Sequence, residues 1–421
     1  MAPPPCSPPE LPEEMQEEIL LRFPPDDPSR LVQAALVCKP WCRLISGPRF
    51  RRRYREFHRT PPLLGLFCNT DEPYNPELGT CGPDIFRFVP TSSFTAPRVN
   101  SRMCWWWVTD ARHGRVLLHR TSEDGVSPTA GCYGLMVWDP TTGEKKELPS
   151  PASALTHANW WTAAVLCDAG ADAGGARHHL DCHREPFIVV FVASCDNEGT
   201  FISTYSSNAA SWSMPIVSTE HALKACYIPE LTHAAHLGNA LYFLMTDSFI
   251  LKYDLELHEM SWIEGPRTST RCSYVALTTT EGGGLGLAIR HESRSRLYMW
   301  SWKDAPKADA KWTRSRAIEL RRFDAALDYS PKVLGFAADI GFIFVMADDK
   351  LYTIDLKTNK LIRKAKVATT RRCICFVVPY FSFYTPCTPA ALEVATIGGE
   401  GRTARGGSQW RQNRAPAPLS E

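Results

Sequence analysis

Residues 11–58 read LPEEMQEEILLRFPPDDPSRLVQAALVCKPWCRLISGPRFRRRYREFH, and this stretch decides the fold of the first part of the chain. Pro12 suits the first turn of a helix, where its missing N–H has no helical partner, and Pro24 ends that helix because proline cannot continue the hydrogen-bond ladder. Pro40 ends a second helix, and Ser46–Pro48 ends a short third one. The stretch therefore predicts a small unit of short helices.

Apolar side chains in this unit outnumber the positions that short helices can bury. Leu11, Met15, Ile19 and Phe23 recur at every fourth position, which places them on one side of a helix. A core of this size contributes little stability, so such a unit usually depends on a partner surface. We expect the surplus to form a helix-in-groove contact with Trp41 as its anchor, since tryptophan is enriched among interface hot spots.

The order of these residues resembles the F-box, the module by which F-box proteins bind the Skp-type adaptor of a cullin ubiquitin ligase. Phe23 stands where the family usually has Leu. The residues that carry the resemblance are Leu11-Pro12, Ile19-Leu20, Phe23-Pro24, Leu31, Val37-Cys38, Trp41, Leu44-Ile45 and Phe50. The alternative is an ordinary helical hairpin that packs on the rest of the chain.

The resemblance implies a set of adaptor-binding residues within the helices and, through the adaptor, an association with a cullin. The residues implied are Leu11, Pro12, Met15, Ile19, Leu20, Phe23, Pro24, Leu31, Val37, Cys38, Trp41, Leu44 and Ile45.

Composition excludes several classes of protein. The 421 residues are 44% hydrophobic and 22% charged with a net charge of +2, so no strong field favours nucleic acid or a membrane surface. No apolar run is long enough to span a bilayer, and the N-terminus MAPPPCSPPE is unlike a secretory signal. The 15 cysteines are scattered singly, which favours a reduced protein of the cytoplasm, the nucleus or both.

From Leu63 onward, short apolar runs alternate with turn residues, a pattern typical of an all-β sandwich, barrel or propeller. A weak repeat favours the propeller: Asp139, Asp254 and Asp355 each follow an apolar run and begin a turn. With intermediate copies at Thr204–Trp212 and Met299–Trp302, the repeat is roughly 50 residues, the length of a four-stranded blade.

The runs expected to be strands are Leu63–Phe67, Phe86–Val89, Val116–Leu118, Leu135–Trp138, Phe187–Val192, Leu241–Leu244, Phe249–Tyr253, Leu285–Ile289, Leu297–Trp300, Gly341–Met346 and Leu351–Ile354.

Three phrases in this region, Arg87–Phe94, Asp110–Leu118 and Val137–Pro140, resemble the F-box-associated β-propeller of plant F-box proteins, especially the expanded grass families. This implies an α + β multidomain protein: a small N-terminal all-α F-box followed by an all-β propeller of about six blades that binds a target. The expected division is a disordered Pro-rich leader at 1–9, the F-box at 10–58, the propeller at 63–387 and a disordered tail at 388–421.

Catalytic and metal-binding patterns were sought and are weak. The run His178–His183 has the wrong order for a dinuclear hydrolase, and no Cys-x-x-Cys pair supports a structural zinc. Glu281–Gly286 lacks the ending of a phosphate-binding loop, and no Gly-x-Ser-x-Gly elbow occurs. We therefore expect no enzymatic activity, no metal and no cofactor.

Two further clusters have both a functional and a structural interpretation. The basic run Arg49–Arg55 could contact nucleic acid, but a solvated helix face offset by nearby glutamates is the commoner arrangement. Trp105–Trp107 and Trp160–Trp161 could supply anchors on the propeller rim, but core packing is the more frequent role of large aromatics.

The sequence thus predicts the substrate-recognition subunit of a Skp–cullin–F-box ubiquitin ligase, with an unknown protein target and neither membrane nor nucleic acid as partner. The alternative is a propeller that binds a glycan or small ligand, with the helices as a structural cap.

Overall fold

The computed structural model describes residues 11–71, 85–94, 106–120, 134–151, 160–168, 185–195, 199–219, 233–245, 249–266, 272–280, 282–291, 296–303, 311–323, 331–337, 341–347, 350–358, 360–366 and 373–386. Within these residues the chain forms four α-helices followed by strands that build six sheets. The predicted leader at 1–9 and tail at 388–421 lie outside them.

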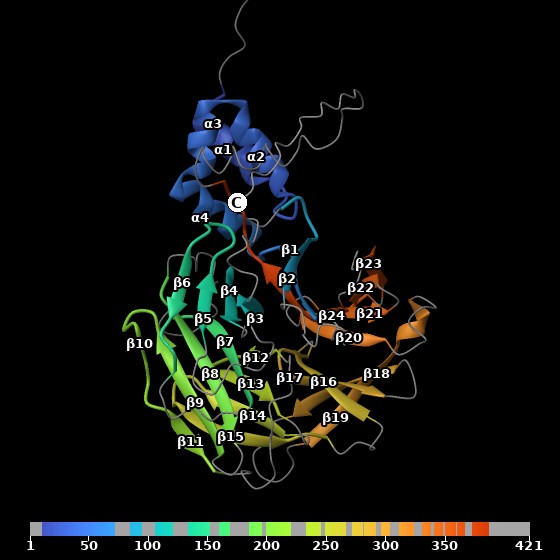
Figure 1. Cartoon of the computed structure of the whole chain (residues 1–421). Coiled ribbons are helices and arrows are strands. Elements are labelled where there is room, and N and C mark those ends of the chain that lie inside the picture. The colour runs from blue at the N-terminus through green and yellow to red at the C-terminus, as the bar shows by residue number, and fades with distance from the viewer. Residues whose placement is uncertain are drawn as a thin grey trace, which may run out of the picture.

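The four helices cluster at one end of the molecule (Figure 1). They are α1 (Glu13–Leu21), α2 (Pro28–Val37), α3 (Lys39–Ser46) and α4 (Pro48–His58). Pro28, Pro40 and Pro48 each lie in the first turn of a helix, where proline is tolerated because its missing N–H would have no partner. Pro40 therefore lies in the first turn of α3 and also marks the break between α2 and α3.

Each sheet is one blade of a six-bladed β-propeller, as the sequence predicted. Blade one consists of β2 (Ile85–Pro90), β1 (Leu63–Asp71) and β24 (Cys373–Phe381). Blade two consists of β3 (Trp106–Arg112), β4 (Arg115–Arg120), β5 (Leu135–Trp138) and β6 (Lys145–Leu148). Blade three consists of β7 (Trp160–Cys167), β8 (Phe187–Cys195), β9 (Gly199–Ser206) and β10 (Ser211–Trp212), with β11 (Ile216–Ser218) also paired to β9.

Blade four consists of β12 (Ala235–Leu237), β13 (Ala240–Leu244), β14 (Phe249–Asp254) and β15 (Glu259–Glu264). Blade five consists of β16 (Cys272–Thr279), β17 (Leu285–His291), β18 (Arg296–Lys303) and β19 (Lys311–Glu319), and the short 3₁₀ helix η5 (Leu320–Arg322) follows it. Blade six consists of β20 (Lys332–Ala337), β21 (Phe342–Ala347), β22 (Lys350–Asp355) and β23 (Lys360–Lys366).

The predicted repeat is a repeat of turns between the third and fourth strands of alternate blades. The carboxylate of Asp139 accepts hydrogen bonds from the backbone N–H groups of Thr141 and Thr142. Asp254 and Asp355 each accept the same pair of bonds, from the residues two and three positions further on. The intermediate copy at Thr204–Trp212 covers the turn between the third and fourth strands of blade three. The copy at Met299–Trp302 lies on β18, the third strand of blade five.

Buried polar side chains join neighbouring blades. The amide of Asn69 in blade one donates to the carbonyl of Val108 in blade two at 2.8 Å and accepts from its N–H at 3.0 Å. The carboxylate of Asp110 accepts a hydrogen bond from the N–H of Val165 in blade three at 3.1 Å. These bonds satisfy groups that would be costly to bury alone, and they fix the angle between blades.

The ring is closed by a strand from the far end of the chain. β24 pairs antiparallel with β1, from Leu63 opposite Phe381 to Asp71 opposite Cys373. The chain then leaves β24 toward the helices, and Phe383 enters the helical core, where it is 5% exposed and packs against Tyr54 with ring centroids 6.2 Å apart. Tyr384 packs on Phe94 of the propeller. One segment therefore closes the ring and fastens the helices to it.

We expect Phe383→Ala to lower the free energy of unfolding by roughly 3–5 kcal/mol, the usual cost of removing a buried phenylalanine ring. Chemical denaturation of the full chain, followed by circular dichroism, measures it. Phe57→Ala is the matched control, because Phe57 is 53% exposed on α4. Equal stability of the two variants would show that Phe383 does not join the domains.

A histidine is enclosed in the aromatic packing between blades two and three. The ring of His119 stacks on Trp107 and meets Trp161 edge-on, with centroids 6.2 and 4.9 Å away, and its Nδ1 lies 2.8 Å from the hydroxyl of Thr109. Burial lowers the pKa of His119 from 6.5 to about 4. The folded protein therefore keeps this ring neutral at pH values where the unfolded chain protonates it.

Because the unfolded chain binds the proton first, stability should be lost as the pH falls from 6.5 toward 4. His119→Phe retains an aromatic ring and removes the titration, so the variant should lose less stability than the natural chain across that window. Thermal melting at a series of pH values measures the difference. Parallel pH profiles for the two proteins would contradict the assignment.

Candidate adaptor-docking surface

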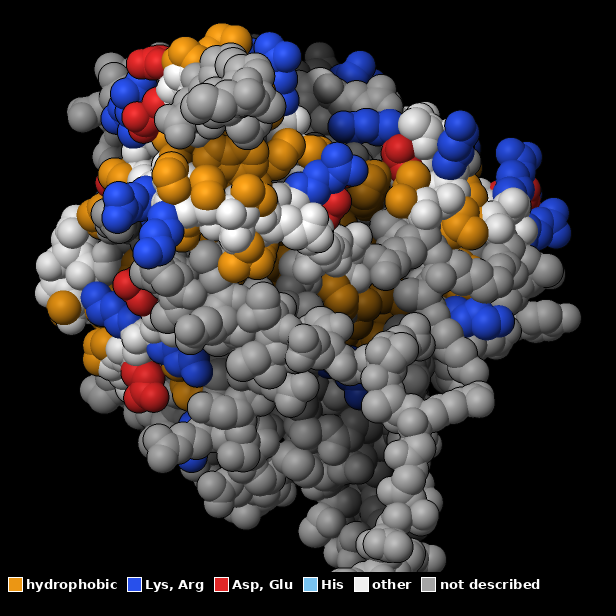
Figure 2. Space-filling view, turned by 90° about the horizontal axis from the view of Figure 1, so that it is seen from above, with side chains coloured by type: hydrophobic (Ala, Val, Ile, Leu, Met, Phe, Trp, Pro, Cys, Tyr) orange, Lys and Arg blue, Asp and Glu red, His pale blue; other side chains and the backbone are white. Residues whose placement is uncertain are grey.

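The helical domain exposes apolar side chains on its outer side. Leu11, Met15 and Ile19 lie along α1 with their side chains in solvent, and Met15 is 54% exposed. Val37, at the end of α2, is 68% exposed. Figure 2, viewed from the helical end, shows hydrophobic side chains gathered over this domain. The first three members of the stripe with fourfold spacing are thus exposed on or just before α1, whereas the fourth, Phe23, packs against the helical core. The exposed members form a surface that a partner could cover.

We call Leu11, Met15, Ile19, Leu36 and Val37 the apolar face. Leu36 was not among the predicted residues, although it neighbours Val37 in sequence. The pattern does not single it out, because its exposure depends on how α2 lies against α3. Pro12, also predicted, is exposed beside this set.

Three predicted adaptor-binding residues lie in the interior of the helical domain. Leu20, Leu31 and Ile45 are no more than 1% exposed and pack in its core, so we correct the prediction for them. They hold the helices together and offer no surface to a partner. Phe23, Pro24, Cys38, Trp41 and Leu44 are half-buried at the edge of this core.

Trp41 links α3 to α1. Its indole N–H donates a hydrogen bond to the side-chain oxygen of Gln16 at 2.7 Å, and Gln16 in turn donates to the carbonyl of Leu11 at 2.6 Å. The ring packs against the helical core. Trp41 therefore positions the start of α1, while part of its surface remains available beside the apolar face.

The basic run on α4 is paired with acidic residues of α1. Glu17 is buried, and its carboxylate lies 2.6 Å from Arg53 and 3.8 Å from Arg49. Arg53 also bonds Glu18 at 2.6 Å, and this bond raises the pKa of the guanidinium. Arg51 donates to the carbonyl of Ser46. Arg53 and Arg49 therefore tie α4 to α1, and the nearby glutamates offset part of the run as the sequence suggested. The expected solvated face describes only part of the run, because Arg55 is 5% exposed.

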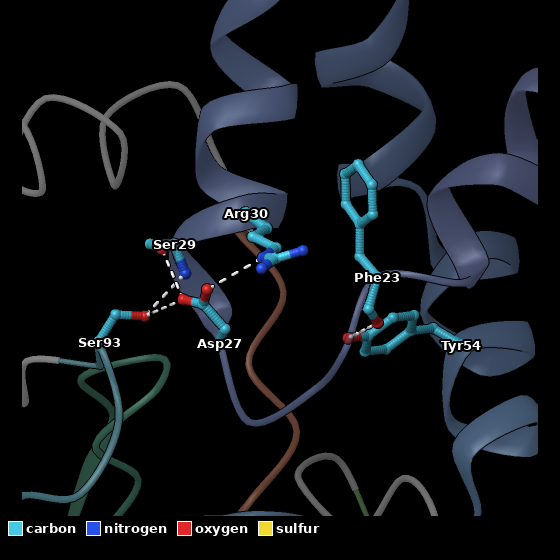
Figure 3. A network of polar contacts seen from close by, with 6 residues as sticks. All are labelled: Phe23, Asp27, Ser29, Arg30, Tyr54 and Ser93. Atoms are coloured by element: carbon cyan, nitrogen blue, oxygen red, sulfur yellow. Dashed lines mark hydrogen bonds and ion pairs between the residues drawn. The ribbon is translucent and has the colours of Figure 1, made fainter.

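A polar contact joins the helices to the propeller at the start of α2 (Figure 3). The hydroxyl of Ser93, which follows β2, donates to Asp27 at 2.8 Å and accepts from the N–H of Ser29 at 2.9 Å. Hydrogen bonds from Ser29 and Ser93 hold the pKa of Asp27 below its usual value. A side chain of the propeller thus caps α2, a role that the local sequence would assign to Asp26, Asp27 or Ser29.

Sequence comparison places both parts of the chain. Residues 9–53 match the F-box domain, and residues 107–387 match the family described as F-box protein AT5G49610-like, beta-propeller. This chain belongs to that F-box family. The family name comes from a plant protein, in agreement with a plant-type F-box protein, and an F-box joined to a propeller is the architecture of a substrate receptor, which is typically non-catalytic.

A search of curated proteins gave no match. Similar solved structures include a protein of unknown function from Bacteroides caccae, with 9% identity over 75% of this chain and 98% of that chain and a TM-score of 0.37. Periplasmic gluconolactonase PpgL of Pseudomonas aeruginosa has 13% identity over 73% and 84%, TM-score 0.37. Saccharomyces cerevisiae Sqt1 has 11% identity over 72% and 83%, TM-score 0.36. Likenesses this weak carry no argument about function.

Other candidate sites of this F-box protein have plain outcomes. Trp106 is buried in the cluster between blades one and two, and Trp107 packs at the edge of that cluster and stacks on His119. Trp160 and Trp161 pack on either side of β7, so core packing accounts for all four. Trp105 and the run 178–183 lie outside the described residues. Among the residues that are described, no three His, Cys, Asp or Glu side chains are grouped to hold a metal ion, and no helix is long and apolar enough to cross a membrane.

We expect Arg53→Ala to destabilise the F-box by about 1–3 kcal/mol, because it leaves the buried carboxylate of Glu17 with only a distant partner. Arg52→Ala is the control: Arg52 is exposed and lies 3.9 Å from Glu56, and such surface pairs contribute only about 0–1 kcal/mol. Denaturant unfolding compares the two. A smaller effect for Arg53 than for Arg52 would contradict the pairing.

Proposed function

We propose that this chain is the substrate-recognition subunit of a Skp–cullin–F-box ubiquitin ligase. The observation that carries the proposal is the apolar face at the outer end of the helical domain (Figure 2). Large side chains left in water across neighbouring helices mark an interaction site. A Skp-type adaptor is the partner that fits an F-box, and the cullin would join through that adaptor.

The propeller would hold the target. It lies at the opposite end from the apolar face (Figure 1), so an adaptor and a target could bind at the same time. Binding a protein beside a charged ubiquitin-conjugating enzyme raises the effective concentration of its lysines, and this accelerates transfer without any catalytic group in the receptor. The chain would therefore act as a receptor without its own catalytic site.

The contacts that join the helices to the propeller support this role. Phe383 and Ser93 both join the propeller to the helices, so an adaptor on α1 and a target on the propeller would keep a defined separation. The free thiols of Cys38, Cys42 and Cys68 suit a reducing compartment, and we place the protein in the cytoplasm, the nucleus or both. On its sequence phrases we also assign it to the grass-type branch of these proteins.

The alternative is a propeller that binds a glycan or small ligand, with the helices as a cap. A cap would bury its apolar side chains against the propeller, whereas Met15 and Val37 face solvent. The exposed face therefore favours the adaptor over the cap.

We expect Met15→Asp combined with Val37→Asp to weaken adaptor binding at least about 30-fold, since hot-spot residues are each worth about 2 kcal/mol or more. Leu11→Ala with Pro12→Ala should have the same direction. Pull-down and calorimetric titration with a purified plant Skp-type adaptor measure the effect.

Met214→Asp combined with Leu257→Asp is the matched control, because these propeller side chains are 85% and 64% exposed and the two substitutions introduce the same charge. It should bind the adaptor as the natural chain does. Retention of full adaptor binding by the α1–α2 variant would reject the docking role.

A further inference from the structure

The outer flank of blades five and six is strongly basic. β19 carries Lys311, Arg314 and Arg316 with Glu319 as its one acidic residue, and β23 (Lys360–Lys366) carries four basic residues and no acidic one. Both are the outermost strands of their sheets. We call the exposed basic residues on or beside the outer strands of these blades the basic flank: Lys303, Lys311, Arg314, Arg321, Arg322, Lys357 and Lys360.

The neighbouring blades have the opposite charge. In the described parts of blades three and four, Lys252 is the one basic residue, against Asp168, Glu185, Asp254, Glu256, Glu259 and Glu264. A net charge of +2 for the whole chain therefore hides a strong asymmetry. Such a one-sided field attracts an anionic partner to one flank and repels it from the other. Figure 2 shows Lys and Arg side chains on the right-hand rim, where Figure 1 places β22 and β23.

One lysine pair within the flank has its two members opposite each other across strands. Lys303 of β18 stands opposite Lys311 of β19. Like charges directly opposite one another destabilise a sheet. The isolated chain gains nothing from this pair, whereas a bound anionic segment would turn the repulsion into attraction.

Two described carboxylates of blades five and six offset part of this charge: Asp355, which stands opposite Lys360 in the register of β22 and β23, and Glu319. Glu319 accepts a hydrogen bond from Arg296 at 2.8 Å, and its carboxylate lies 3.4 Å from Arg321 and 3.3 Å from Arg322. One carboxylate is thus shared among three guanidinium groups. Lys311 and Lys360, further along the two outer strands, are exposed to solvent.

The surface suits a polypeptide better than a nucleic acid. Single-stranded nucleic acids stack their bases on exposed aromatic rings, but Trp300, Trp302 and Trp312 of blade five pack into the interface with blade four. The indole N–H of Trp312 donates to the carbonyl of Glu264 at 2.8 Å. An outermost strand offers backbone N–H and C=O groups to an extended peptide, and Ile362 of β23 adds an exposed apolar contact.

We propose that the basic flank binds an acidic, extended polypeptide segment. If the chain is a ligase receptor, as proposed above, this segment belongs to the target protein. The flank would then select substrates that have an exposed acidic tail or loop. The segment would lie along β19 or β23 with its carboxylates beside the lysines and an apolar residue on Ile362.

The test uses the full chain bound to its adaptor and a fluorescein-labelled peptide that alternates Glu and Val. Fluorescence anisotropy should show binding that weakens as salt is added. Lys311→Glu combined with Lys360→Glu should weaken binding about tenfold or more, since each reversal replaces an attraction by a repulsion. The proposal would be overturned if this variant bound the peptide as tightly as the natural chain, or if the natural chain did not bind the peptide. The lysines would then serve to protect the sheet edges from pairing with other strands.

Lys145→Glu with Lys146→Glu is the matched control, because it reverses the same number of charges on β6, the outermost strand of blade two. It should retain peptide binding. A single-stranded RNA that binds the flank more tightly than the peptide would also overturn the proposal. An adaptor pull-down is carried out on the same variants. A variant that loses peptide binding but keeps full adaptor binding tests the flank alone. The adaptor binding of the α1–α2 variant tests the ligase role.

Discussion

The pairing of β24 with β1 is the interaction on which the remainder of the structure depends. It brings the last described strand against the first, so that the two ends of the propeller share one blade and the six blades close into a ring. Closing so long a loop is entropically costly, and the cost is offset by a full-length antiparallel register and by burial of residues such as Phe67, Val378 and Tyr380 in the cluster around it. The same segment then delivers Phe383 to the helices.

This arrangement makes the small helical unit part of a larger folding unit. Four short helices enclose a modest core, and their apolar face stays in solvent. Phe383 supplies the missing core volume from one side, and Ser93 supplies a cap for α2 from the same side. The exposed apolar side chains lie outside these contacts, so the propeller stabilises the helices without burying the apolar face.

The distribution of charge follows a related division. Buried carboxylates and amides such as Asp110 and Asn69 are used to join blades, where low exposure makes each hydrogen bond matter. The outer strands carry charge of one sign each, acidic on β15 and basic on β19 and β23. The ring sets blades five and six next to each other (Figure 1), and their basic outer strands therefore belong to the same part of the propeller.

The sequence by itself determined the F-box resemblance, the propeller and the middle strands of the blades. Nearly all predicted strands, among them β4, β8, β13, β17 and β21, are middle strands, buried on both faces and therefore read as continuous apolar runs. Inner strands such as β3 and outer strands such as β19 were missed because their polar residues break that pattern. Only the tertiary structure decided that Leu20, Leu31 and Ile45 are core while Met15 and Val37 are surface, because helical spacing gives a side of a helix but not what covers it. The roles of Phe383 and Ser93 were likewise beyond the sequence, since each acts on helices distant along the chain.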